Sequence, residues 1–177
     1  QIQRAVNACL KAFAKNQRLA DMIAAKLGAK PLVRSLQKHV EEGTLVGTSE
    51  AITAIVIHSD ANIDLFAAAG VCPAVAHVLG TNKENPAVLA SATTTLRAIS
   101  SKTDQIPTVL SADVLPLVIE NINNYHDDEE IVKASFGLIA NLAENEEAIV
   151  ELKRLDSANS IMAALEYHPY MKEILDL

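Results

Sequence analysis

Apolar residues recur at helical spacing in four stretches of the chain, at residues 5–13, 49–57, 91–99 and 134–142. Within each stretch the apolar positions lie three or four residues apart, which is the spacing of one face of an α-helix. A polar break follows each stretch, and then a shorter apolar segment such as 63–69 or 106–111. No segment alternates apolar and polar residues with a period of two. The pattern predicts an all-α protein with more than about 60% helix and no sheet, whereas an average globular protein is about one third helical.

Three prolines mark a repeat in the sequence. Pro31, Pro73 and Pro116 lie 42 and 43 residues apart, each is followed by an apolar stretch, and Ser160 continues the phase 44 residues later. Proline fits the first turn of a helix because the N–H that it lacks has no partner there, and its φ angle is already helical. We therefore expect each proline to open a second helix, between a short first helix and a long third one.

Residues that favour helix capping precede the third helices, at 47–50, 85–86 and 127–130. A side-chain oxygen at such a position accepts hydrogen bonds from the free N–H groups of the first helical turn. In the last of these segments, Asp127 is placed to accept from the N–H of Glu130 while Glu130 reaches back. The sequence therefore predicts that a third helix starts at each of these places.

A period near 42 residues built from helices is typical of a solenoid, in which each unit buries its apolar face against its neighbours. We interpret residues 1–177 as one solenoid domain with repeats at 29–69, 70–112 and 113–156 and partial repeats at 1–28 and 157–177. The sequence opens on Gln1 inside a helical pattern, so we expect it to be a piece of a longer protein.

Apolar residues near the two ends should then face neighbours that this piece lacks, which predicts self-association. These residues are Ala8, Leu10 and Phe13 at the start and Ile161, Met162, Leu165, Ile174 and Leu175 at the finish.

Charge and hydropathy exclude several classes of partner. The formal net charge is −7, from 22 acidic and 15 basic residues. The basic residues form no run dense enough to follow a phosphate backbone, which argues against nucleic acid. No apolar run approaches the roughly 18 residues of a membrane span, and no signal-peptide pattern opens the sequence. We expect no membrane insertion and a cytoplasmic protein, with the nucleus as the alternative.

Thiol and imidazole groups are scattered along the chain. Cys9 and Cys72 are isolated on apolar helical stretches, as is typical of small buried hydrophobes. His39, His58 and His77 are spaced 19 residues apart but fall on different helices, so we predict no shared set of metal ligands.

The acidic runs at 127–130 and 144–147 fit helix caps and solvated edges better than a calcium site, which needs carboxylates wrapped around one point. Clustered acid could also steer a basic partner. The six glycines form no phosphate-binding loop. We therefore predict no catalytic residue, no cofactor and no metal.

Two segments resemble the armadillo repeat family. Residues 70–79, Gly-Val-Cys-Pro-Ala-Val-Ala-His-Val-Leu, are similar to the motif that opens its second helix, and residues 137–143 are similar to its third-helix motif. The related HEAT repeats are the alternative, but their units usually hold two helices and lack the glycine and proline. The resemblance implies a right-handed α-solenoid of three-helix repeats, whose third helices line a concave groove that binds protein partners.

In importin alpha and beta-catenin, members of that family, an asparagine on each third helix holds the backbone of an extended peptide, and importin alpha adds a tryptophan one turn earlier. The asparagine position reads Ala12, Val56, Ala98 and Asn141 here, and the tryptophan position reads Ala8, Ile52, Thr94 and Gly137. We predict that Ile52 and Val56 stay partly exposed as groove anchors, with Arg4, Arg97 and Lys133 near the rim.

Alanine and valine cannot hydrogen-bond a peptide backbone, so this groove would suit a partner's helical segment or another folded surface. The competing interpretation is that the small residues only tighten the stacking of units. We predict a non-catalytic scaffold or adaptor that binds a protein partner through the groove. The alternatives are a structural or dimerisation segment of a larger cytoskeletal, motor or ciliary protein, and a HEAT-like regulatory subunit.

Overall fold

The computed structural model describes residues 2–168, and helices account for 81% of those residues. No strand occurs in that range, so the predicted all-α fold is confirmed. The helices are α1 (Ile2–Phe13), α2 (Gln17–Leu27), α3 (Lys30–Lys38), α4 (Glu42–Val56), α5 (Asp60–Ala68), α6 (Val71–Thr81), α7 (Pro86–Ser100), η1 (Thr103–Gln105), α8 (Ile106–Leu110), α9 (Val114–Asn124), α10 (Glu129–Leu142), α11 (Glu146–Arg154) and α12 (Ser157–Tyr167).

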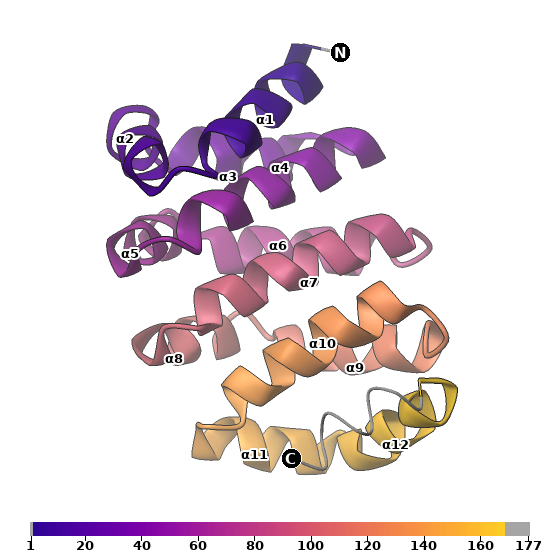
Figure 1. Ribbon diagram of the computed structural model, residues 1–177. Helices are drawn as coiled ribbons and strands as arrows, with labels where there is room; N and C mark the ends of the chain where they lie inside the picture. Colours follow the sequence, from indigo (N-terminus) through magenta and orange to yellow (C-terminus); the bar gives the residue numbers. More distant parts are fainter. Residues whose placement is uncertain (1, 169–177) are drawn as a thin grey trace.

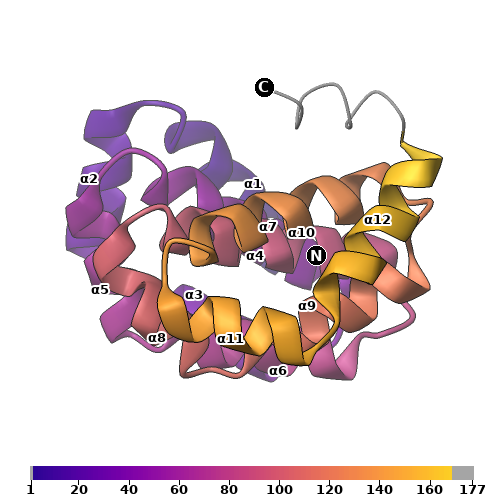
Figure 2. The ribbon, with the colours of Figure 1, turned by 90° about the horizontal axis from the view of Figure 1, so that it is seen from below.

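The helices stack as units of three (Figure 1). A first, a second and a third helix form each unit: α2–α3–α4, α5–α6–α7, and α8–α9–α10 with η1 leading into α8. The third helices α4, α7 and α10 follow α1 in one layer, and the second helices α3, α6 and α9 form the opposite layer (Figure 2). Each third helix packs on the next, which makes one continuous stack.

The turn between first and second helix contains a residue with a positive φ angle in each unit. Gly70, Asp113 and Asp156 adopt the left-handed conformation, with φ angles of 84°, 53° and 54°, whereas Gly28 has a φ angle of 70° but a ψ angle of 164°, outside that region. Glycine adopts this left-handed region without steric cost, and aspartate is one of the few other residues that tolerate it. A proline follows within the first turn of α3, α6 and α9, as predicted.

Two of the three predicted third-helix starts are confirmed in position. Asn85 caps α7 by accepting from the N–H of Val88 at 3.2 Å. At α10 the cap is Asp128 and not the predicted Asp127, because the helix begins one residue later and Asp128 accepts from the first free N–H groups.

The third prediction, a helix start at 47–50, is wrong because α4 already begins at Glu42. Glu42 follows Pro31 by 11 residues, whereas Pro86 follows Pro73 by 13. The second helix of this unit, α3, has 9 residues against 11 in α6. This two-residue shortening moves the third helix forward along the sequence.

The shortening changes which residues of α4 face the concave side. Glu50 and Ala54 match Thr94 and Ala98 of α7, 44 residues later, and are partly exposed as those are. Ile52 and Val56 turn to the opposite side, where both are fully buried at 0% exposure. The prediction that these two aliphatics line the groove is therefore wrong, and they belong to the core.

Polar side chains join neighbouring units across the stack. Asp64 accepts two bonds from the Lys102 ammonium at 2.6 Å and one from the Gln105 amide at 2.8 Å. The bonds from Lys102, and then that from Gln105, lower the pKa of the Asp64 carboxyl. Thr53 and Thr95 share a hydroxyl contact of 3.1 Å between α4 and α7. These bonds fix the lateral register of one unit on the next.

Candidate binding groove

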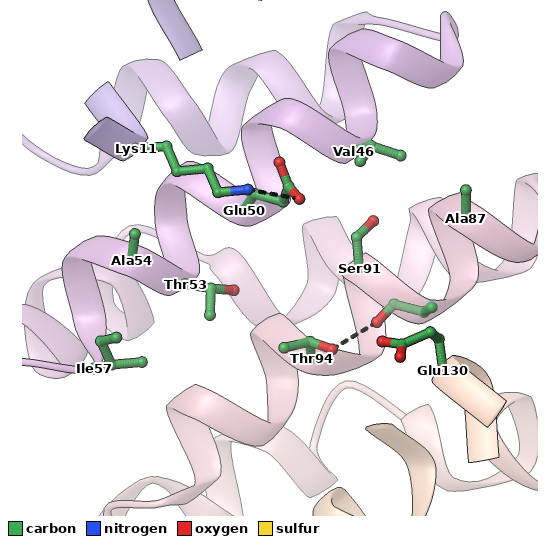
Figure 3. Close-up of a pocket in the computed structure, with 11 residues that line it drawn as sticks. Lys11, Val46, Glu50, Thr53, Ala54, Ile57, Ala87, Ser91, Thr94 and Glu130 are labelled. Atoms are coloured by element: carbon green, nitrogen blue, oxygen red, sulfur yellow. Dashed lines mark hydrogen bonds and ion pairs between the residues drawn. The ribbon is translucent and has the colours of Figure 1, made fainter. Parts of the chain in front are cut away.

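The concave face holds a hollow of about 490 Å³ between α4 and α7 (Figure 3). Lys11 and Glu130 border it from α1 and α10, and the residues that line it from α4 and α7 are Val46, Glu50, Thr53, Ala54, Ile57, Ala87, Ala90, Ser91 and Thr94. Most of these side chains are small. Because alanine and serine fill little volume, the space between α4 and α7 stays open. The largest apolar group is Ile57, which is 60% exposed.

A second hollow of about 390 Å³ continues this groove between α1 and α4. Lys11, Val46 and Glu50 line both hollows. The predicted groove residues Arg4, Ala8 and Ala12 lie here. The concave face is therefore one trough across α1, α4 and α7.

The polar groups of the trough are mostly engaged with one another. The Lys11 ammonium pairs with the Glu50 carboxylate at 2.8 Å, and the Thr94 hydroxyl donates to the Ala90 carbonyl at 2.8 Å (Figure 3). Glu130 is exposed, and its side chain has no hydrogen bond or ion pair within residues 2–168. Among the described residues, Glu130 is therefore a carboxylate without a counter-charge at the edge of the hollow, whereas Glu50 is paired.

Asn141 does not present its amide to the groove as predicted. Its Nδ2 donates to the Arg97 carbonyl and to the Ser100 Oγ, both at 3.0 Å, so it binds α10 to α7. Both N–H groups are consequently occupied, and only the side-chain oxygen is left to meet a ligand. The prediction that Asn141 holds the backbone of a bound peptide is therefore wrong: its amide joins the third helices α10 and α7.

The Arg97 side chain of α7 lies across α10, the next third helix in the stack. A Cβ atom built on Gly137 would come within 2.6 Å of the Arg97 Cδ and Cζ, so the guanidinium stem occupies the space that a side chain would take. Arg4 and Gly43 repeat this arrangement at the first junction, where the built Cβ lies 2.6 Å from the Arg4 Cζ. Glycine in these helices makes room for an arginine from the preceding unit.

The rim charges differ in their pairing. Arg4 binds Glu41 at 2.8 Å and Lys133 binds Glu129 at 3.2 Å. Arg97 makes no ion pair within residues 2–168. Ala98 and Gly137 are partly exposed.

Of the residues that line the central hollow, the sequence reasoning found only Thr94 and missed Lys11, Val46, Glu50, Thr53, Ala54, Ile57, Ala87, Ala90, Ser91 and Glu130. The number of residues between each proline and the start of the next third helix is the signal that could have found them. This number is two smaller in the first unit, which moves the groove positions of α4 by two residues.

Other candidate chemistry is dispersed. Within residues 2–168 no three side chains of His, Cys, Asp or Glu are placed to hold a metal ion. Burial raises the pKa of the Cys72 thiol to about 11. Cys9, predicted to be buried, is exposed. Of the helices in this range, none alone is long and apolar enough to cross a membrane; α5 and α6 meet the length and composition only together, bent by 68°.

No family model matches the sequence, and no curated protein matches it either. Solved structures with a similar fold include an engineered protein and two designed armadillo repeat proteins. An engineered protein from a structural genomics consortium has a TM-score of 0.80 at 22% identity, over 89% of this chain and 64% of that one. A designed armadillo repeat protein in complex with the peptide (KR)4 has a TM-score of 0.77 at 20% identity, over 93% of this chain and 74% of that one.

A computationally designed armadillo repeat protein for modular peptide recognition has a TM-score of 0.74 at 20% identity, over 91% of this chain and 73% of that one. The three-helix units of this chain and its similarity to designed armadillo repeat proteins indicate the same fold. The chain has the fold of the armadillo repeat proteins, an all-α solenoid.

Proposed function

We propose that the chain is a non-catalytic scaffold that binds an amphipathic helical segment of a protein partner in the trough over α4 and α7. The observation that carries this proposal is the hollow lined by Val46, Ala54 and Ile57, in which the hydroxyls of Thr53, Ser91 and Thr94 are already hydrogen-bonded within the stack. Its volume of about 490 Å³ lies within the range of about 300 to 1,000 Å³ that is typical of ligand pockets.

The floor disfavours an extended peptide. Ala12, Ala54 and Ala98 hold the positions that carry asparagine in importin alpha, and Asn141 is already bonded to α7. An extended chain buried there would leave amide groups unpaired at a cost of about 1–3 kcal/mol each. A helix satisfies its own amides and presents an apolar stripe, so it avoids this cost.

Charge adds a preference within that class of partner. Lys11 and Glu50 neutralise each other, whereas Glu130 stands exposed beside Ala87 and Thr94 at the hollow. A lysine or arginine at one edge of the bound helix would meet this carboxylate. Such rim contacts select partners and orientation more than they add affinity.

The test is a selection from two displayed peptide libraries, one of stapled helices and one of proline-containing extended peptides. We expect binders from the helical library. Removing the contact with Ile57 should cost them about 1.5–3 kcal/mol, so Ile57→Glu should weaken binding at least about tenfold. Leu65→Glu is the matched control, because Leu65 is an exposed aliphatic on α5 outside the groove residues.

Binders that come only from the extended library would refute the helical partner and leave the groove intact as a site. Binders that tolerate Ile57→Glu as well as Leu65→Glu would refute the groove itself. A melting curve of each variant separates lost binding from lost folding.

A second candidate function is the structural or dimerisation role, which the exposed apolar side chains of Phe13, Leu19 and Val150 favour. The units of three helices argue against the HEAT-like alternative, whose units usually hold two.

A further inference from the structure

Helix α1 and the third helices α4, α7 and α10 carry four cationic side chains, which are Arg4, Lys11, Arg97 and Lys133. Three of the four bind a carboxylate of the stack at 2.8 to 3.2 Å. The Arg97 guanidinium has no ion pair and no hydrogen bond with residues 2–168. Arg97 is therefore the exception among the cations of this layer in the described part of the chain.

The ion pair of Lys11 with Glu50 shows what is missing at Arg97. Lys11 and Arg97 hold the same position in α1 and α7, one residue before an alanine of the groove. Glu50 and Gly137 hold the same position in α4 and α10, the helices that follow these two. At the α1–α4 junction the cation meets a carboxylate at 2.8 Å (Figure 3). At the α7–α10 junction the matching carboxylate is absent, because glycine has no side chain.

The Arg97 side chain has a defined position although it lacks a counter-charge. A Cβ atom built on Gly137 would lie 2.6 Å from the Arg97 Cδ and Cζ, so the arginine covers the glycine. The Arg97 carbonyl accepts from the Asn141 Nδ2 at 3.0 Å, which ties the α7 backbone to α10 at this residue. The side chain is nevertheless exposed. Its N–H groups are thus available to a ligand from a fixed place on α10.

This place lies beside the trough. Lys11, the match of Arg97, lines both hollows, and Thr94, about one helical turn before Arg97, lines the central hollow. Glu130 borders the central hollow from α10. Gly137 follows Glu130 by seven residues, so the two positions lie on one side of α10 about 10.5 Å apart along its axis. The α10 side of the trough therefore presents a cation and an anion, neither of them paired within residues 2–168.

The guanidinium group determines which ligand fits. Its N–H donors form a planar fork that matches the two oxygens of a carboxylate. We propose that Arg97 binds an aspartate or glutamate of the helical partner, whose carboxylate takes the role that Glu50 has at the α1–α4 junction. The proposal rests on the proposed function, since it needs a helix in the trough, and it adds an acidic residue to the partner.

The partner helix then carries both signs of charge on one flank. Its base meets Glu130 and its acid meets Arg97. Two sites about 10.5 Å apart correspond to about seven residues, or two turns, of a helix that lies along α10. A helix with only basic residues beside its apolar stripe would bring a like charge to Arg97, which disfavours it. The trough is therefore expected to select helices of mixed charge.

A double-mutant cycle between protein and peptide tests the contact. The probe is the tightest stapled helix from the helical library, in which we expect an Asp or Glu about two turns from a Lys or Arg. Replacing this acid by its amide should weaken binding to the parent protein about three- to tenfold and should hardly affect binding to Arg97→Gln. Arg34→Gln is the matched control and should respond like the parent. Arg34 is an exposed arginine on α3, in the opposite layer, and has no ion pair within residues 2–168.

A carboxylate built into the chain should compete with the partner. Gly137→Glu recreates at Arg97 the pair that Lys11 forms with Glu50, whereas Gly137→Gln displaces the arginine without adding charge. The parent should prefer the acidic helix to its amide version, Gly137→Glu should lose this preference, and Gly137→Gln should keep it. The atoms nearest to the built Cβ belong to the flexible Arg97 side chain, so both variants should fold, as melting curves can verify.

The outcomes separate this proposal from the proposed function. Equal weakening by the amide on the parent and on Arg97→Gln overturns the role of Arg97, as does a set of helical binders without an acid at this spacing. The groove still stands in both cases if Ile57→Glu abolishes binding. If no helical peptide binds, this proposal falls together with the helical partner.

Discussion

Val56, the last residue of α4, and Ile57, which directly follows it, should respond oppositely to truncation. Val56 is fully buried, whereas Ile57 is 60% exposed on the concave face. Val56→Ala and Ile57→Ala therefore test the corrected phase of this helix with two changes one residue apart. The sequence pattern alone places Val56 in the groove, whereas the structure places it in the core. These two placements predict opposite outcomes for the two variants.

The structure sets the expected size of each effect. Val56→Ala removes two methyl groups, worth about 1.6 kcal/mol at about 0.8 kcal/mol per group. A rigid core leaves much of their volume empty, which raises the total to about 3 kcal/mol by the cavity dependence of about 24 cal/mol per Å³. Ile57→Ala removes more carbon but leaves no cavity, and most of the side chain already contacts water, so its cost should stay below about 1 kcal/mol.

Thermal unfolding followed by circular dichroism measures the difference. For a domain of this size 1 kcal/mol corresponds to a Tm change of about 2–4 °C, so Val56→Ala should lower the Tm by about 6–12 °C and Ile57→Ala by less than about 4 °C. Binding of selected peptides should change only with Ile57→Ala. A stable Val56→Ala together with a destabilised Ile57→Ala would refute the assignment of the two faces.

Three further changes test other features of the structure. Asp128→Ala should cost about 1 kcal/mol through the lost cap of α10, while Asp127→Ala should be nearly neutral, as urea unfolding can show. Asn141→Ala should lower stability by about 1–2 kcal/mol in the same assay, because two bonds to α7 are lost, without removing a donor from the groove. The Asp64 carboxyl has a folded-state pKa below its ordinary value, so its stabilising effect is present above the unfolded-state pKa and is lost as pH falls through the folded-state pKa. Lys102→Met should therefore reduce the acid dependence of unfolding between about pH 4 and the lower, folded-state pKa, and identical pH profiles would contradict this account.

The repeat and the helical class could be predicted from the sequence because they rest on local signals. Proline near a helix start and asparagine at a cap act through their own backbone, so Pro73 and Asn85 were assigned to the right places. The start of α4 could not be found in this way. Thr48 resembles a capping residue, but in the folded chain it bonds Asn7 at 2.8 Å and Ser35 at 3.1 Å inside the stack.

The candidate site depended on the same error. A shift of two residues rotates a helix by more than half a turn, so Ile52 and Val56 were placed on the face opposite to their true one. Leu10 and Leu165, expected to face missing neighbours, are each only 8% exposed, since α1 packs on α4 and α12 packs on α9 and α11, whereas Phe13 and Met162 are exposed as predicted. Ile174 and Leu175 lie outside the described residues. The position of Arg97 over Gly137 is a tertiary contact with no local signal.

The bonds between units also bear on how the chain folds during synthesis. They join residues 37 to 46 positions apart, from Arg4 with Glu41 to Thr95 with Ser49. A unit that leaves the ribosome therefore finds its partners in the unit made just before it. Short sequence separations favour rapid folding, and domains fold in the order of their synthesis. The growing chain can thus cover each new apolar face within about one unit of elongation, which limits the time that it spends open to aggregation.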